Sequence, residues 1–121
     1  MLDRLRDIVG DKGLIADPGD MAPWLTDWRE RRKGRALCVV APASTAEVAA
    51  VMRLCAEEGQ PVFPVGGNTG LCFGAVPESG RADRPGIVLS LRRMNKIRAI
   101  DRAGNVATVD AGVVLGDLHA A

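Results

Sequence analysis

The stretch PVGGNTGLCFGAVP, residues 64–77 and here called the glycine loop, holds four glycines between two prolines and carries no charged side chain. Glycine and proline both interrupt regular structure, so this stretch predicts a loop. Consecutive glycines can adopt positive φ and lack a Cβ, so their N–H groups can turn toward one bound anion. Asn68 and Thr69 add side-chain donors. Spacing alone leaves two interpretations open, an anion cradle or a long turn after a strand.

Two common nucleotide-binding motifs do not fit the glycine loop. A P-loop needs a lysine directly after its last glycine, and Leu71 follows Gly70 here. The fingerprint G-x-G-x-x-G fails because Val65 occupies the position of its first glycine. Without a cation for terminal phosphates, the loop suits a permanently held pyrophosphate better than a triphosphate that exchanges with magnesium.

The residues around the loop predict a βαβ unit. Residues 36–40 and 60–65 have the apolar character of buried strands. Between them, Ser44 and Glu47 match a capping box at the start of a helix, and Gly59 matches a helix end. A strand, a helix and a second strand normally form a right-handed unit with parallel strands.

The rest of the chain predicts further elements of an α+β fold. Residues 2–10 have helical spacing of apolar side chains, and residues 87–91 predict a strand. Residues 96–110 form two segments with alternating apolar and polar side chains, separated by a turn, and this pattern predicts a β-hairpin. The fold class is therefore α+β, a βαβ unit followed by antiparallel strands.

The chain divides into two parts in this interpretation. Residues 1–35 are expected to form a helix and an irregular lead-in, and residues 36–121 a partial domain. The chain stops at LGDLHAA, which predicts a helix that has barely begun, so we expect a truncated part of a longer protein. A sheet that continues beyond residue 121 would leave an open edge here, which favours self-association.

Composition excludes several function classes. The net charge of +1 gives no general attraction to nucleic acid or anionic membranes. Three distant cysteines and a single histidine predict neither a metal site nor a disulfide framework. No apolar run approaches the roughly 20 residues of a membrane span, and the N-terminus does not resemble a signal peptide. We expect a cytoplasmic protein with reduced thiols.

Residues 29–35 hold five basic side chains. Such a cluster is typical of a solvated loop, and a partner rich in phosphate, such as nucleic acid, is the alternative interpretation. We expect the solvated loop and no nucleic-acid partner.

The loop and its flanks resemble the FAD-binding domain of vanillyl-alcohol-oxidase-type flavoproteins. The resemblance is strongest to FAD-linked D-2-hydroxy-acid dehydrogenases, which include D-lactate and D-2-hydroxyglutarate dehydrogenases and glycolate oxidase subunits. Their loop typically reads P-x-G-G-N-T-G-L-x-G-G-[SA]-x-P. The similarity extends over residues 24–121, through the strand, the R-M-N turn, the hairpin and the V-x-A-G segment. It implies the first subdomain of a PCMH-type FAD-binding fold, with FAD as cofactor.

By position, the resemblance implies a set of cofactor-binding residues within the glycine loop. They are Pro64, Val65, Gly66, Gly67, Asn68, Thr69, Gly70, Gly74 and Ala75. Residues 66–70 would hold the pyrophosphate, residues 74–75 would close the loop, and residues 64–65 would lie against the adenosine side. Phe73 stands where the family usually has glycine, so either its side chain points away from the cofactor or the loop geometry differs from that of the family. Residues 111–112 match a family segment and are interpreted as a structural turn.

The resemblance implies oxidation of a D-2-hydroxy acid to the 2-oxo acid by the full-length protein, with the redox chemistry supplied by the flavin. In the family the substrate domain lies further along the chain, so no catalytic residue is assigned here and this part alone is expected to be inactive. Neither the substrate nor the electron acceptor is predicted. The alternative is a non-catalytic binding or regulatory module that keeps the fold without the cofactor.

Overall fold

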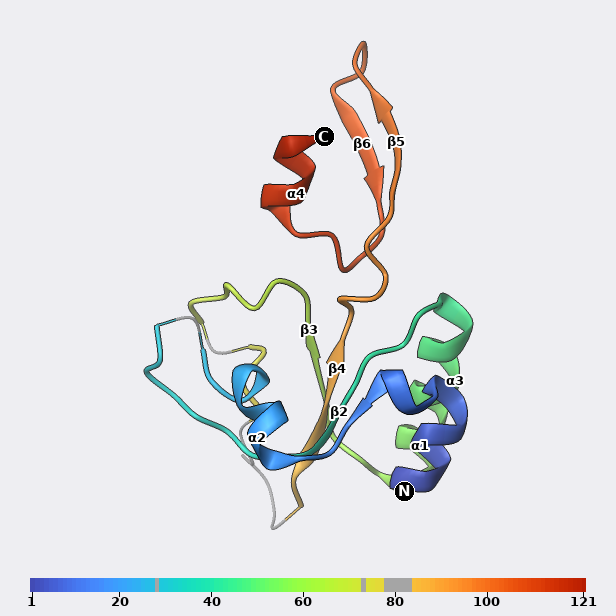
Figure 1. Ribbon diagram of the computed structural model, residues 1–121, viewed down its shortest axis with the longest axis vertical. Helices are drawn as coiled ribbons and strands as arrows, with labels where there is room; N and C mark the ends of the chain where they lie inside the picture. The colour runs from blue at the N-terminus through green and yellow to red at the C-terminus, as the bar shows by residue number, and fades with distance from the viewer. Residues whose placement is uncertain (28, 73, 78–83) are drawn as a thin grey trace.

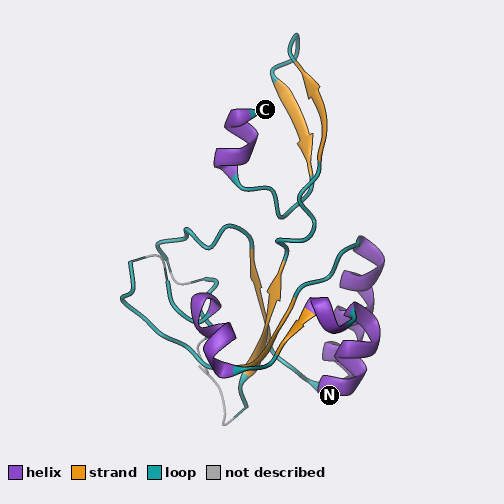
Figure 2. Ribbon diagram, viewed as in Figure 1, coloured by secondary structure: helices purple, strands orange, loops and turns teal. Residues whose placement is uncertain are grey.

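The computed structural model describes residues 1–27, 29–72, 74–77 and 84–121, which form both helices and strands (Figures 1 and 2). The helices are α1 (Leu2–Val9), α2 (Pro18–Met21), α3 (Thr45–Glu58) and α4 (Leu115–Ala120), with short 3-10 helices η1 (Asp11–Gly13) and η2 (Ala22–Trp24). The strands are β1 (Leu14–Ile15), β2 (Ala36–Val40), β3 (Val62–Val65), β4 (Gly86–Ser90), β5 (Ile97–Asp101) and β6 (Val106–Val109). The predicted α+β class is confirmed.

Strand β4 is central in the main sheet, whose order is β1-β2-β4-β3. It is parallel to both β2 and β3, while β1 pairs antiparallel with β2. All residues of β4 are buried, as expected for a parallel strand covered on both faces. The predicted βαβ unit is present as β2–α3–β3, but β4 lies between its two strands instead of beyond them. Only β5 and β6 follow as an antiparallel pair.

The capping signals predicted for α3 are both present. Ser44 Oγ accepts a hydrogen bond from the Glu47 N–H at 3.2 Å, and Glu47 Oε2 accepts one from the Ala43 N–H at 2.6 Å. The Ser44 bond satisfies a helix amide that would otherwise lack a partner, whereas the Glu47 side chain bonds the amide one residue before the N-cap instead of the Ser44 N–H of a standard capping box. Gly59 ends the helix with a left-handed φ of 62°, which glycine adopts without a steric penalty.

Two apolar clusters cover the two faces of the sheet. Helices α1 and α3 pack on one face, with a core of Leu5, Val9, Cys38, Val40, Val51, Leu54, Cys55, Ile87 and Leu89. The segment that contains α2 and η2 covers the other face, with a core of Met21, Leu25, Val39, Val65 and Val88. The division follows from strand geometry, since successive side chains of a strand point to opposite faces. The first 35 residues therefore supply cover for both faces (Figure 1).

The hairpin of β5 and β6 extends with α4 away from the main sheet (Figure 1). All of β6 is exposed, and so is β5 apart from Ile97. The apolar side chains of Ile100, Val106 and Leu115 are 51%, 56% and 63% exposed. Within the described residues, this end of the chain thus has apolar surface that nothing covers.

We expect Ser44→Ala to lower the free energy of unfolding by about 1 kcal/mol, because the Glu47 amide loses its acceptor. Ser44→Gly should cost only a few tenths of a kcal/mol, since glycine is itself tolerated at a helix N-cap. Urea unfolding followed by circular dichroism measures both variants. Equal losses would contradict the capping role of the hydroxyl.

Candidate functional site at the glycine loop

The glycine loop begins in β3 and leaves the sheet at the carboxyl ends of β2, β3 and β4 (Figure 1). In open parallel sheets, ligands bind outside these ends of the strands. A hydrogen bond of 3.0 Å from the Leu91 N–H to the Val65 carbonyl keeps the start of the loop attached to the centre of the sheet. At the same end, Ser90 Oγ is buried and has no hydrogen-bond partner in the described part of the chain.

The residues assigned to the cofactor by resemblance lie together but differ in exposure. Val65 is buried at 3% exposure in the second core cluster, and Ala75 packs against that cluster. Pro64, Gly66, Gly67, Thr69, Gly70 and Gly74 are exposed, and Asn68 is half-buried. Phe73, whose orientation was a separate expectation, lies outside the described residues. The loop is thus anchored by buried apolar side chains near both ends, where Val76 and Pro77 are buried as well, and its glycines lie exposed between them.

The backbone N–H groups of residues 66–72 are free to bind a ligand. Among the residues that the structure describes, none accepts a hydrogen bond from them. Within the described part of the chain, this stretch is exposed to solvent apart from half-buried Asn68. A run of such groups can act as an anion-binding concavity.

The loop glycines leave open space in front of the backbone. A Cβ added at Gly66, Gly67, Gly70 or Gly74 would lie at least 3.8 Å from every described atom beyond the adjacent residues. None of the four has a positive φ, so this loop does not use the conformational freedom that glycine offers. The turn is made instead by Asn68, with φ of 55°. Neither packing nor backbone conformation within the chain therefore requires glycine at these four positions.

Gly112 shows the opposite situation. A Cβ at this position would overlap the carbonyl oxygen of Leu91 and lie 2.8 Å from that of Met94. The Gly112 N–H also donates to the Met94 carbonyl at 2.9 Å. The turn at residues 111–112 accordingly needs glycine for the close approach of two backbone segments.

The side chain of Asn68 is engaged within the protein. Its Nδ2 donates to the carbonyls of Pro23, at 3.1 Å, and Thr26, at 3.3 Å. Both amide hydrogens are used by these bonds, so the predicted donation from this side chain to a ligand does not fit the geometry. The Asn68 backbone N–H is still available. Sequence reasoning missed these contacts because the partners lie more than 40 residues earlier.

The segment that Asn68 contacts folds back on itself and also reaches the far end of the loop. Thr26 bridges to Lys33 in antiparallel fashion. The Gly34 N–H donates to the Leu25 carbonyl at 2.7 Å, and the Arg35 N–H donates to the Pro77 carbonyl at 3.1 Å. The segment predicted to be an irregular lead-in therefore contacts both ends of the glycine loop.

Asp27 organises the turn that bears the basic cluster. Its carboxylate is buried and accepts hydrogen bonds from the N–H groups of Arg32, at 2.7 Å, and Arg29, at 3.2 Å. Burial acts to raise the pKa of Asp27, but the backbone N–H groups of Arg32, Arg31 and Arg29 outweigh it and lower this pKa below its ordinary value. The basic segment is thus held by an internal acid.

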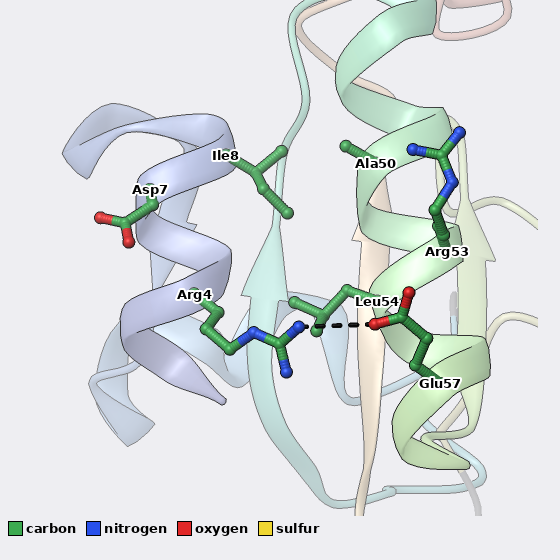
Figure 3. A pocket seen from close by; sticks show the side chains of 7 residues that line it. All are labelled: Arg4, Asp7, Ile8, Ala50, Arg53, Leu54 and Glu57. Atoms are coloured by element: carbon green, nitrogen blue, oxygen red, sulfur yellow. Dashed lines mark hydrogen bonds and ion pairs between the residues drawn. The ribbon is translucent and has the colours of Figure 1, made fainter.

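A separate groove of about 310 Å³ lies between α1 and α3 (Figure 3). Ile8 and Leu54 line it, and Arg4 reaches across from α1 to Glu57 on α3 at 3.4 Å. No residue of the glycine loop lines this groove. It is the seam between two packed helices, bridged by an exposed ion pair of the kind that contributes little stability.

Thiol and metal chemistry have little support in the described residues. Burial and the neighbouring thiol of Cys55 raise the pKa of Cys38 to about 12, and burial raises that of Cys55, so both stay protonated. Cys72 is exposed and, like the other two, free. No group of three potential ligands among His, Cys, Asp and Glu occurs in the described ranges. No helix there is long and apolar enough to cross a membrane.

Residues 36–121 match a protein family described as FAD binding domain. A probable mitochondrial D-2-hydroxyglutarate dehydrogenase of Oryza sativa subsp. indica is 34% identical over 113 residues, which cover 93% of this chain and 19% of that protein. A D-lactate dehydrogenase of Anaerostipes hadrus is 36% identical over 118 residues, 98% of this chain and 24% of that protein. The chain spans about a fifth of the length of these relatives.

The fold is also found among solved structures. The crystal structure of p-cresol methylhydroxylase with substrate bound superposes with a TM-score of 0.79 at 24% sequence identity. The match covers 98% of this chain and 23% of that one. The PCMH-type fold implied by the sequence resemblance is confirmed.

We expect Gly112→Ala to destabilise the chain strongly, because its Cβ would overlap backbone that cannot move independently. Gly70→Ala should leave stability unchanged or raise it slightly, since the site is open and alanine restricts the unfolded chain. Thermal unfolding of both variants tests the contrast. A large loss for Gly70→Ala would mean that packing explains the loop glycines after all.

We expect stability to fall as the pH is lowered through the native pKa of Asp27. The folded pKa lies below the ordinary value of 3.8, so the ionised carboxylate stabilises the fold above that value and the contribution is lost on further acidification. Asp110, whose pKa is lowered chiefly by its hydrogen bond with Arg98, acts in the same direction. Asp27→Asn should be less stable at pH 7 and lose less stability between about pH 5 and 3. If the denaturant midpoints of the wild type and Asp27→Asn declined in parallel as the pH is lowered, the assignment of this pH dependence to Asp27 would be disproved.

Proposed function

The chain belongs to the FAD-binding domain family, and we propose that it is the N-terminal, FAD-holding part of a flavoprotein that oxidises a D-2-hydroxy acid to the 2-oxo acid. The observation that carries this proposal is the run of unpaired N–H groups at residues 66–72, with open space in front of the glycines. The substrate class is supported by the names of the relatives, D-2-hydroxyglutarate and D-lactate dehydrogenases.

We propose that residues 66–70 hold the FAD pyrophosphate through backbone N–H groups and the exposed Thr69 hydroxyl. A pyrophosphate carries negative charge at two phosphates, and no acidic side chain lies between Gln60 and Val76 to oppose it. The absence of Cβ atoms at the glycines lets phosphate oxygens approach the amides closely. The residues present therefore fit this cofactor group, in a cradle made mainly of backbone.

The remaining loop residues have supporting roles in this proposal. Gly74 and Ala75 close the loop, with Ala75 anchored on the second core cluster. Pro64 and Val65 border the adenosine side, where Val65 contributes backbone because its side chain is buried. When bound, FAD supplies the electron-accepting chemistry, and the protein positions it. The electron acceptor that reoxidises the flavin is not specified by these residues.

For the whole protein, we propose that residues 36–121 are part of an FAD-binding domain on which residues 1–35 pack, and that the domain continues in the full-length polypeptide. The shares of the relatives' lengths and the exposed apolar side chains of β5, β6 and α4 support this. The same exposed hairpin supports the proposal that the isolated chain self-associates. A cytoplasmic location remains a proposal supported by the free thiols, although the rice relative is named mitochondrial.

The test is FAD binding by the full-length protein and by Gly70→Ala. We expect the wild type to retain flavin absorbance through gel filtration and to lose it on reduction by a D-2-hydroxy acid. Gly70→Ala should fold normally but bind FAD at least about tenfold more weakly, because its methyl group enters the cradle. Gly116→Ala, also at an open position but in α4, is the control and should bind normally.

Two outcomes would count against the proposal. A folded wild-type protein that binds no FAD would favour the alternative, a non-catalytic module that keeps the fold. Equal FAD affinity of the wild type and Gly70→Ala would place the cofactor phosphates elsewhere.

A further inference from the structure

We propose that residues 23–27 and 29–35, here called the loop frame, position the glycine loop for its ligand, with Asn68 as the positioning residue that connects the two. All of the loop frame lies before the family match at residues 36–121. The part of the inference that names FAD as the ligand rests on the proposed function. The contacts between the loop frame and the glycine loop are independent of that proposal.

The loop frame holds the glycine loop near both ends. Near its start, the Asn68 amide donates to the Pro23 and Thr26 carbonyls. At its end, the Arg35 N–H donates to the Pro77 carbonyl, and a Cβ at Gly34 would lie 2.5 Å from that same oxygen. Between these contacts, residues 69–72 make no backbone hydrogen bond of their own in the described structure. The frame therefore contributes to the position of their N–H groups, beside the anchors at Val65 and Ala75.

The loop frame is itself fixed to the sheet. Leu25 is buried in the second core cluster, and Asp27 ties the turn together through the N–H groups of Arg29 and Arg32. The Arg92 guanidinium lies over the Trp24 ring, 4.9 Å from its centroid. Arg92 follows β4 closely, so this contact joins the frame to the end of the sheet where the loop emerges.

The properties of asparagine explain the choice of residue at position 68. Asparagine tolerates the left-handed φ of 55° better than most residues with a side chain. Its amide offers two donors, which match two carbonyls, whereas aspartate would offer none. Glycine would make the same turn without fixing it. Asn68 therefore both turns the loop and fixes it to the frame, and its side chain acts on the ligand only through the backbone.

The test is Asn68→Gly in the full-length protein, with Asn105→Gly as the matched control. Asn105 lies in the turn between β5 and β6 with φ of 52°, so both substitutions put glycine at a left-handed position without adding charge. The Asn68 variant keeps the backbone N–H and loses only the side-chain bonds. Hydrogen–deuterium exchange without FAD and FAD titration by flavin fluorescence are measured for all three proteins.

We expect Asn68→Gly to exchange faster in the peptides that cover the loop frame and the glycine loop, and at the wild-type rate in α3 and β4. Its FAD affinity should fall about tenfold, whereas Asn105→Gly should match the wild type in both measurements. Faster exchange throughout the molecule would indicate a general structural role and overturn the positioning role.

Two further results would also overturn the inference. One is unchanged exchange in both segments, which would show that Asn68 does not connect them. The other is faster local exchange with unchanged FAD affinity. If the wild type binds no FAD, the proposed function fails, and the exchange measurements alone decide whether the frame holds the loop.

Discussion

The pairing of β4 on both of its edges is the constraint on which the other features of this chain depend. Buried backbone amides and carbonyls need partners, and a central strand obtains them only from two neighbours. Because β2 and β3 both run parallel to β4, their carboxyl ends meet at one edge of the sheet. The glycine loop emerges at that edge, and the helices and the N-terminal segment cover the two faces beside it (Figure 1).

Beyond this edge of the sheet, the backbone N–H groups of the glycine loop differ from those of the sheet in their hydrogen bonding. Strand β4 is paired on both edges and α3 is capped at both ends, whereas residues 66–72 have N–H groups without protein acceptors among the described residues. Groups of the N-terminal segment hold the loop from outside, namely the Pro23 and Thr26 carbonyls that accept from the Asn68 amide and the Arg35 N–H that donates to Pro77. The N–H groups of residues 66–72, which have no acceptor among the described residues, thus lie in a segment whose borders are held by hydrogen bonds.

Sequence reasoning succeeded where the determining interactions are local. The capping box at Ser44 and Glu47 and the helix end at Gly59 are decided within a few residues, and all were predicted correctly. The position of β4 between β2 and β3 was missed, because strand order depends on pairing between distant segments. The partners of Asn68 were missed for the same reason. Two glycines that look alike in the sequence also differ in their packing. The backbone of Leu91 and Met94 leaves no room for a side chain at Gly112, whereas the space at Gly70 is open, and the sequence does not distinguish the two.

The strand order also determines when this fold can form. Strands β2 and β3 do not pair with each other, and each pairs instead with β4, whose residues 86–90 come later in the chain. A growing chain on the ribosome therefore holds β2 and β3 without their shared central partner until that segment emerges, although β2 can already pair with β1. The glycine loop and the N-terminal segment have by then already been synthesised, and they reach their final positions only in a late, long-range event. Such non-local closure is slow compared with helix formation, so α3 can exist well before there is a sheet for it to cover.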